Sequence, residues 1–215
     1  MRIGLFGGTF NPIHVGHLAA PKAALQRFQL DRVYFIPNGY PPHKHHPAPF
    51  ADRLAMVALA CNNESRFIPS AAEAPNGKTR YSIQTVRRFR KEMGEDAELF
   101  FLIGADAFLT IRSWQQWRGL LDATHFVVIS RPGFDLGRVE TVLPAKWKRR
   151  GTPRDRRGIE YRLQDTSVFV ISGVWEPISA TDIRNALAPG GRADRSLPAA
   201  VAEYLRKTGL YLGLK

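Results

Sequence analysis

Cysteine is nearly absent from the chain, which has Cys61 alone among its 215 residues. A single thiol excludes an internal disulfide framework, and a reducing compartment is its natural environment. Cys61 lies in a stretch rich in Ala, Leu and Met and is predicted to be a small buried hydrophobic residue. The sequence also lacks an apolar run of about 20 residues and the charged-then-apolar pattern of a signal peptide. We therefore expect a cytoplasmic protein without a membrane partner.

Acidic residues are scarce beside basic ones, with 19 Asp and Glu against 31 Lys and Arg and a formal net charge of +12. Between Lys146 and Arg162 eight basic residues stand against two acidic ones, so half of the excess lies in one stretch. This stretch is rich in Gly, Pro and Arg, and it predicts a solvated basic excursion near residues 137–165. A basic balance suits a nucleic-acid binder or an enzyme that attracts small anions. Because a basic loop can bind RNA incidentally, a nucleic acid is the less favoured partner.

Short apolar runs alternate with helical stretches along the chain. Strands are predicted over residues 2–6, 32–36, 66–69, 98–103, 125–130 and 168–171. Helices are predicted over residues 17–28, 51–61, 81–93, 108–121 (interrupted near residue 113), 181–187 and 198–207. The alternation predicts an α/β fold, a Rossmann-like, doubly wound and mainly parallel sheet with flanking helices. We expect one domain over residues 1–215, with a core over 1–176 and a small helical part over 177–215.

The loop between the first predicted strand and helix reads Gly7-Gly8-Thr9-Phe10-Asn11-Pro12-Ile13-His14-Val15-Gly16-His17. A strand, a glycine turn and a helix place an anion at the helix N-terminus, where unpaired N–H groups and the dipole favour negative charge. Gly7 and Gly8 permit close approach of a ligand and a positive φ. His14 and His17, three residues apart, would share one face of a first helical turn and reach the same anion. The spacing of the loop matches neither the P-loop nor G-x-G-x-x-G. By itself it is also compatible with a pair of histidines that binds a metal.

Two motifs carry a resemblance to a known family. The first loop resembles the H-x-G-H motif of nucleotidyltransferases, and residues 178–184, Ile-Ser-Ala-Thr-Asp-Ile-Arg, resemble their second motif, I-S-x-T-x-I-R. The blocks Pro41-Pro42-His43-Lys44 and Ile103-Gly104-Ala105-Asp106 are similar to one branch, the bacterial nicotinate-nucleotide adenylyltransferases. This resemblance covers nearly the whole chain.

The resemblance implies an enzyme of NAD biosynthesis that transfers the adenylyl group of ATP to nicotinate mononucleotide, with Mg²⁺, giving deamido-NAD and pyrophosphate. Nicotinamide mononucleotide and phosphopantetheine remain alternative acceptors, and a basic nucleic-acid-binding protein is the alternative of another class. The acceptor phosphate is already an anion at neutral pH, because its second pKa is about 6. The reaction therefore needs positive charge and alignment more than a strong base.

The resemblance also implies the roles of individual residues. His14 and His17 would donate to the α-phosphate, Arg184 would hold the β- and γ-phosphates, and Asp106 would lie near the ribose and the magnesium-bound waters. The implied catalytic residues are His14, His17, Lys44 and Arg184. The implied ATP-binding residues are Gly7, Gly8, Thr9, Phe10, Gly104, Asp106, Ser179, Thr181 and Ile183. The implied nicotinate mononucleotide-binding residues are Thr85, Trp114 and Lys44, with Trp117 as a competing stacker on the pyridine ring.

Two further expectations follow from the residues. Ser179 or Thr181 is predicted to cap the helix that follows it. The histidines at positions 43, 45 and 46 have no Cys or carboxylate among them, so no metal site is predicted there. The sequence leaves a homo-oligomer open.

Overall fold

The computed structural model describes residues 1–40, 47–130, 134–135, 137–144, 148–150, 158–163, 165–172, 178–189, 191 and 193–213. Its helices are α1 (Val15–Arg27), α2 (Phe50–Cys61), α3 (Ser82–Met93), α4 (Ala105–Phe108), α5 (Trp117–Ala123), α6 (Arg138–Val142), α7 (Ala180–Leu187) and α8 (Ala199–Thr208), with 3-10 turns at Ile111–Ser113 and Asp194–Ser196. Its strands are β1 (Arg2–Gly8), β2 (Arg32–Pro37), β3 (Phe67–Pro69), β4 (Glu98–Gly104), β5 (His125–Ile129), β6 (Lys148–Arg150), β7 (Gly158–Arg162) and β8 (Ser167–Ile171).

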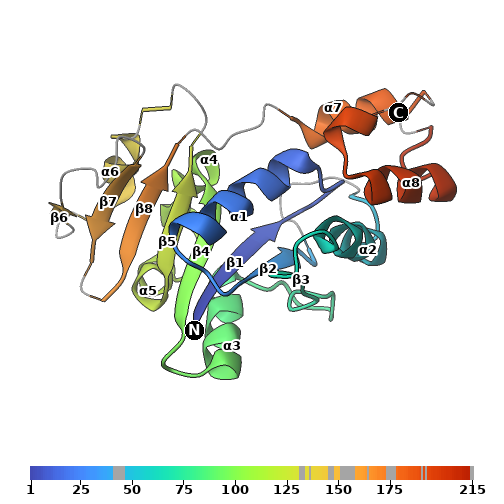
Figure 1. The fold of residues 1–215 in the computed structure, drawn as a ribbon. Coiled ribbons are helices and arrows are strands. Elements are labelled where there is room, and N and C mark those ends of the chain that lie inside the picture. Colours follow the sequence, from blue (N-terminus) through green and yellow to red (C-terminus); the bar gives the residue numbers. More distant parts are fainter. Residues whose placement is uncertain are drawn as a thin grey trace. The chain divides into compact units, whose positions relative to one another are not determined.

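The strands form one sheet in the order β3-β2-β1-β4-β5-β8-β7-β6 (Figure 1). Strands β1, β4, β5 and β8 run parallel: Phe6 pairs with Leu102, Leu102 with Val127, and Val127 with Phe169. Parallel neighbours need crossover connections, and the helices between these strands supply them. The predicted Rossmann-like α/β fold is confirmed.

The residues group into two compact units. The first contains residues 1–6, 20–33 and 80–175, and its core is the continuous apolar run of β4 together with β5; Leu99 and Phe126 are both fully buried. The second contains residues 7–19, 34–79 and 176–215, and in it α2 packs against β3 and α8. The single domain with a core over residues 1–176 stays a prediction.

The described part of the basic stretch contains two strands that were not predicted, where the sequence indicates a solvated loop or excursion. Strand β7 pairs antiparallel with β8, and β6 pairs antiparallel with β7. The signal that was missed is an alternation of apolar and charged residues: Ile159, Tyr161 and Leu163 alternate with Glu160 and Arg162. Tyr161 is fully buried. The density of charge hid this alternation, which is typical of a strand with one buried face.

The predicted helices differ from the observed ones by more than one residue at two places. Helix α1 begins at Val15, two residues earlier than predicted, so that His17 lies in its first turn. The stretch 108–121 is not one helix but the end of α4, a 3-10 turn and α5, with the interruption at Ser113 as predicted. Cys61 is buried at the end of α2, as predicted, and burial raises the pKa of its thiol to about 12.

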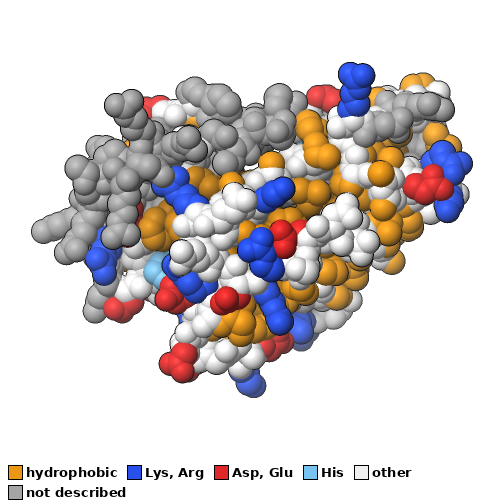
Figure 2. All heavy atoms as spheres, in the orientation of Figure 1, with side chains coloured by type: hydrophobic (Ala, Val, Ile, Leu, Met, Phe, Trp, Pro, Cys, Tyr) orange, Lys and Arg blue, Asp and Glu red, His pale blue; other side chains and the backbone are white. Residues whose placement is uncertain are grey.

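The surface of the described residues carries both acidic and basic side chains. Figure 2 shows acidic side chains interspersed among basic ones on the face drawn. Taken over the residues with described positions, no helix is both long enough and apolar enough to cross a bilayer.

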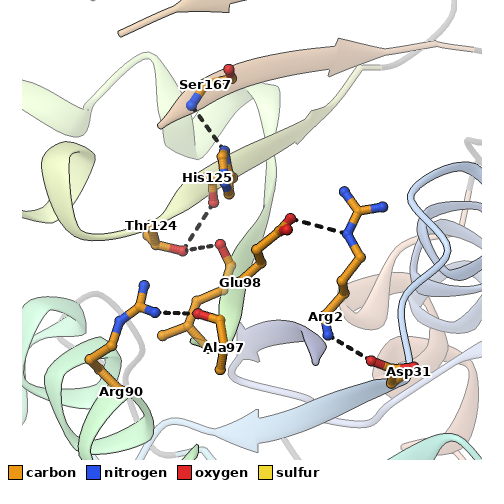
Figure 3. A network of polar contacts seen from close by, with 9 residues as sticks. Arg2, Asp31, Arg90, Ala97, Glu98, Thr124, His125 and Ser167 are labelled. Carbon is orange, nitrogen blue, oxygen red and sulfur yellow. Dashed lines mark hydrogen bonds and ion pairs between the residues drawn. The ribbon is translucent and has the colours of Figure 1, made fainter. Parts of the chain in front are cut away.

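Polar contacts meet at the amino ends of β1, β4 and β5 (Figure 3). The backbone N–H of Arg2 donates to Asp31 at 2.6 Å, and its Nε donates to Glu98 at 3.1 Å. The Arg2 guanidinium also lies 4.9 Å from the centre of the Phe100 ring, and the His125 ring stacks on Phe100 at 4.8 Å. Phe100 is therefore the apolar centre of this cluster.

We expect Phe100→Ala to lower the free energy of unfolding by about 3–5 kcal/mol, because Phe100 is 1% exposed and its removal leaves a cavity. Glu98→Gln is the matched control, since it breaks only the exposed ion pair with Arg2 and should cost less than about 1 kcal/mol. Denaturant unfolding measures both values, and equal costs would contradict this assignment.

Candidate active site

The first-motif loop runs from the end of β1 at Gly8 to the start of α1 at Val15 and holds the two histidines against each other. The His14 N–H donates to Nδ1 of His17 at 3.2 Å, and the His17 N–H donates to the His14 carbonyl at 2.9 Å. The two ring centres lie 3.6 Å apart. The two histidine side chains therefore lie side by side, as predicted.

Both histidines are neutral at pH 7 in this structure. Burial lowers the pKa of His14 from 6.5 to about 4, and burial together with the charge of His14 lowers that of His17 to about 3. Because Nδ1 of His17 accepts a hydrogen bond, the ring proton of His17 lies on Nε2. Two imidazoles with ring centres 3.6 Å apart cannot both be cations at low cost, so a bound anion would draw at most one proton onto the pair.

The glycines of this loop differ from expectation in one respect. A positive φ occurs at Phe10 (49°), and neither Gly7 nor Gly8 has one. A side chain at Gly8 would lie 2.9 Å from the Phe10 ring, whereas nothing lies within 4 Å of a Cβ placed on Gly7. Gly7 thus leaves open space beside the backbone, and Gly8 makes room for Phe10. The Phe10 side chain is buried against His17, so a contact of Phe10 with ATP would come from its backbone.

The second motif begins α7 and is capped as predicted. The Ser179 hydroxyl accepts from the N–H groups of Thr181 at 3.2 Å and of Asp182 at 3.4 Å. The Ile183 side chain is 4% exposed, so its role is to anchor the helix by packing. The cap satisfies two backbone donors that the first turn of a helix leaves unpaired.

Arg184 connects the second motif to the first. Its Nη1 donates to the Asn11 carbonyl at 2.8 Å and to the Ala180 carbonyl at 3.1 Å, and its Nη2 donates to the Thr181 hydroxyl at 3.2 Å. The Asn11 bond spans 173 positions of the sequence. The structure therefore places Arg184 beside the loop that carries His14 and His17.

Arg53 is a buried cation that the sequence reasoning missed. Its side chain is 1% exposed, and it donates to the carbonyls of Ala48 and Thr9, each at 2.9 Å. Burial lowers the pKa of its guanidinium below the usual value for arginine. Among the residues whose positions are described, neither Arg53 nor Arg184 forms an ion pair with a carboxylate.

A signal for Arg53 was present in the sequence. It lies on the apolar stripe of α2, three and four residues before the fully buried Met56 and Val57. A basic residue on such a stripe is rarely buried without a partner. Its position therefore indicates a specific acceptor, which here is the carbonyl of Thr9.

Three of the residues implied to bind nicotinate mononucleotide or the ribose, Thr85, Asp106 and Trp114, belong to the first unit. Thr85 is buried on α3, and Asp106 is exposed in the first turn of α4, directly after Gly104 at the end of β4. Trp114 is half-buried: its Nε1 donates to the Thr110 hydroxyl at 3.4 Å, and its ring meets the Phe101 ring at 6.2 Å, edge to face.

Trp117 is equally half-buried, with the Arg118 guanidinium 4.7 Å from its ring centre. Burial therefore does not separate the two tryptophans as candidates for stacking. Lys44 and the histidines at positions 43, 45 and 46 lie outside the described residues. Among the described residues, no three His, Cys, Asp or Glu side chains form a group that could hold a metal ion.

Comparison with known proteins places this loop-and-helix arrangement in a family. The model of cytidylyltransferase-like proteins matches residues 5–186. The probable nicotinate-nucleotide adenylyltransferase of Solibacter usitatus is 40% identical over 215 residues, covering 98% of this chain and 100% of the relative. The chain belongs to the nicotinate-nucleotide adenylyltransferase family.

Other relatives of the nicotinate-nucleotide adenylyltransferase family agree. The probable enzyme of Moorella thermoacetica is 38% identical over 98% of this chain and 91% of its own length. Nicotinic acid mononucleotide adenylyltransferase of Plasmodium falciparum, complexed with NaAD, matches with a TM-score of 0.73 at 17% identity, over 98% of this chain and 97% of that one. At this identity the structural match supports the fold alone.

The stability of this family member should fall as the pH is lowered from 7 to 5. His14 and His17 have lower pKa values in the folded state than the usual 6.5, so the unfolded chain binds more protons below pH 6.5. Each histidine then contributes a loss of roughly 2 kcal/mol between pH 7 and pH 5. Denaturant unfolding of wild type and His14→Asn at both pH values measures this, and the variant should lose about 2 kcal/mol less. An equal loss in both proteins would contradict the assigned pKa of His14.

Arg53→Met should lower the free energy of unfolding by about 3 kcal/mol, because two buried carbonyls lose their donor. Arg53→Lys should cost less, since it keeps the charge and one of the bonds. Arg66→Met is the control: Arg66 is an exposed arginine paired with Glu64, and its loss should cost under about 1 kcal/mol. A free energy of unfolding of Arg53→Met within 1 kcal/mol of the wild-type value would show that Arg53 does not stabilise the first-motif loop.

Proposed function

We propose that the chain transfers the adenylyl group of ATP to nicotinate mononucleotide, giving deamido-NAD and pyrophosphate. The observation that carries this proposal is the 2.8 Å bond from Arg184 to Asn11, which joins the two motifs of the family in one place. The acceptor phosphate forms a bond to the α-phosphorus of ATP, and the bond from that phosphorus to the β-phosphate oxygen breaks. Pyrophosphate leaves with the bonding electrons.

The residues of the second unit supply the donors that this reaction needs. His17 carries its proton on Nε2 and would donate to an oxygen of the α-phosphate, and His14 would take up a proton as the anion raises its pKa. Arg184 would hold the leaving β- and γ-phosphates through donors other than the one it gives to Asn11. Ser179 and Thr181 at the start of α7 would add a hydroxyl or backbone donor.

Mg²⁺ fits this set of residues as a companion of ATP rather than as a protein-bound metal. Mg²⁺ commonly keeps several waters and is held by substrate phosphates with one or two carboxylates. Asp106, exposed in the first turn of α4, is the carboxylate that would bind its waters. When bound, the ion would neutralise charge on the phosphates.

Thr85, Trp114 and Lys44 would bind nicotinate mononucleotide. Trp114 would stack on the pyridine ring, and Thr85 would help to hold its carboxylate. An acid and an amide are nearly isosteric, so selection between them depends on donors at one end of the ring. The cytoplasmic location and the less favoured place of a nucleic-acid partner stay predictions from the sequence, which leaves a homo-oligomer open.

The test is pyrophosphate release with ATP and Mg²⁺, comparing nicotinate mononucleotide, nicotinamide mononucleotide and phosphopantetheine as acceptors. We expect a strong preference for the first. His17→Ala should lower turnover by at least about a hundredfold with the fold intact, because it removes a donor to the transition state. His125→Gln, at a histidine outside the proposed site, is the matched control and should remain near wild type.

Preference for another acceptor would overturn the assignment of nicotinate mononucleotide but not the chemistry of the two histidines. Near-normal turnover of His17→Ala would overturn that chemistry. Release with none of the acceptors would overturn the proposed function itself.

A further inference from the structure

Tyr211 is a buried residue that neither motif contains. It lies three residues after α8, is 5% exposed, and has a φ of 75°. A positive φ is costly for an aromatic residue, of the order of 1–3 kcal/mol, and persists only where the surroundings hold it. The neighbouring backbone is held from one side, because the Gly213 N–H donates to the Ala188 carbonyl at the end of α7.

From the other side the Tyr211 hydroxyl reaches the first-motif loop. It donates to Oδ1 of Asn11 at 2.7 Å, and the same oxygen accepts the Ala48 N–H at 3.0 Å. The backbone carbonyl of Asn11 is the acceptor for Arg184. Asn11 is thus a junction, contacted by three segments: the turn after α8, the segment that precedes α2, and the second motif.

The chemistry of these groups keeps the junction fixed at neutral pH. Burial raises the pKa of the Tyr211 hydroxyl above its usual value, although Arg184 and Arg53 oppose this rise, so the hydroxyl stays protonated and can donate. The amide of Asn11 does not titrate, and its Oδ1 can accept two hydrogen bonds at once. Asn11 lies in the first-motif loop itself, three residues before His14.

We propose that Tyr211 is a positioning residue of the adenylyl-transfer site, holding Asn11 so that the His14–His17 loop and Arg184 keep their relative geometry. This inference rests on the proposed function, and it assigns to Tyr211 no contact with substrate. Misplacement of reacting groups by about 1 Å can cost a hundredfold in rate, so loss of one hydrogen bond at this junction should reach turnover.

The test compares Tyr211→Phe with Tyr204→Phe by steady-state pyrophosphate release. Tyr204 is the matched control, because its hydroxyl donates at 2.6 Å to Asp52 on α2, in the same unit but not to the loop. We expect kcat of Tyr211→Phe to fall about tenfold or more. The KM for nicotinate mononucleotide should stay within about twofold, since that substrate is assigned to other residues. Tyr204→Phe should stay within about twofold of wild type in both, with a thermal stability as low as that of Tyr211→Phe.

A double-mutant cycle with Asn11→Ala separates positioning from simple loss of stability. If Tyr211 acts through its hydrogen bond to Asn11, the variant that carries both Tyr211→Phe and Asn11→Ala loses no more kcat than Asn11→Ala alone. Losses that multiply, equal kcat losses in the two tyrosine variants, or a Tyr211→Phe enzyme within twofold of wild type would each overturn the proposal. Inactivity of the wild-type protein with every acceptor would instead refute the proposed function, and the two failures are therefore distinguishable.

Discussion

The carbonyl oxygens of the first-motif loop are satisfied by donors from distant parts of the chain, and the site depends on this arrangement. The Gly8 carbonyl accepts from the Asn38 backbone, the Thr9 carbonyl from Arg53, and the Asn11 carbonyl from Arg184. A buried carbonyl without a donor is costly, so each of these contacts constrains where the loop lies. The contacts also occupy the negative ends of the peptide dipoles, which would otherwise repel an approaching phosphate.

Two of these donors are arginines whose charge no described carboxylate neutralises, while the histidines on the same loop are neutral. A fixed cation costs more when buried than a neutral imidazole, and it keeps its charge at every physiological pH. The arrangement thus separates two tasks. The arginines give a permanent positive potential, and the histidines give directed hydrogen bonds and the capacity to take up one proton.

The fold class, the mainly parallel sheet and the cap at Ser179 could be predicted because each has a local signal: apolar runs that alternate with helical periods, or a capping residue. The contact of Arg184 with Asn11 was not predicted, since a contact across 173 positions leaves no local pattern, and the resemblance implies only that both motifs serve one site. Arg53 was missed because a basic residue in a helix is ordinarily read as exposed. The strands β6 and β7 were missed because charge density was given more weight than the alternation at Ile159, Tyr161 and Leu163.

The antiparallel addition of β7 and β6 also changes how the sheet ends on that side. Without it, β8 would present a row of unpaired backbone groups to a strand of another molecule. With it, β6 follows β7 in the strand order, and β6 consists of the three consecutive basic residues Lys148, Arg149 and Arg150. Both edges of β8 are therefore paired within the chain, with β5 on one side and β7 on the other.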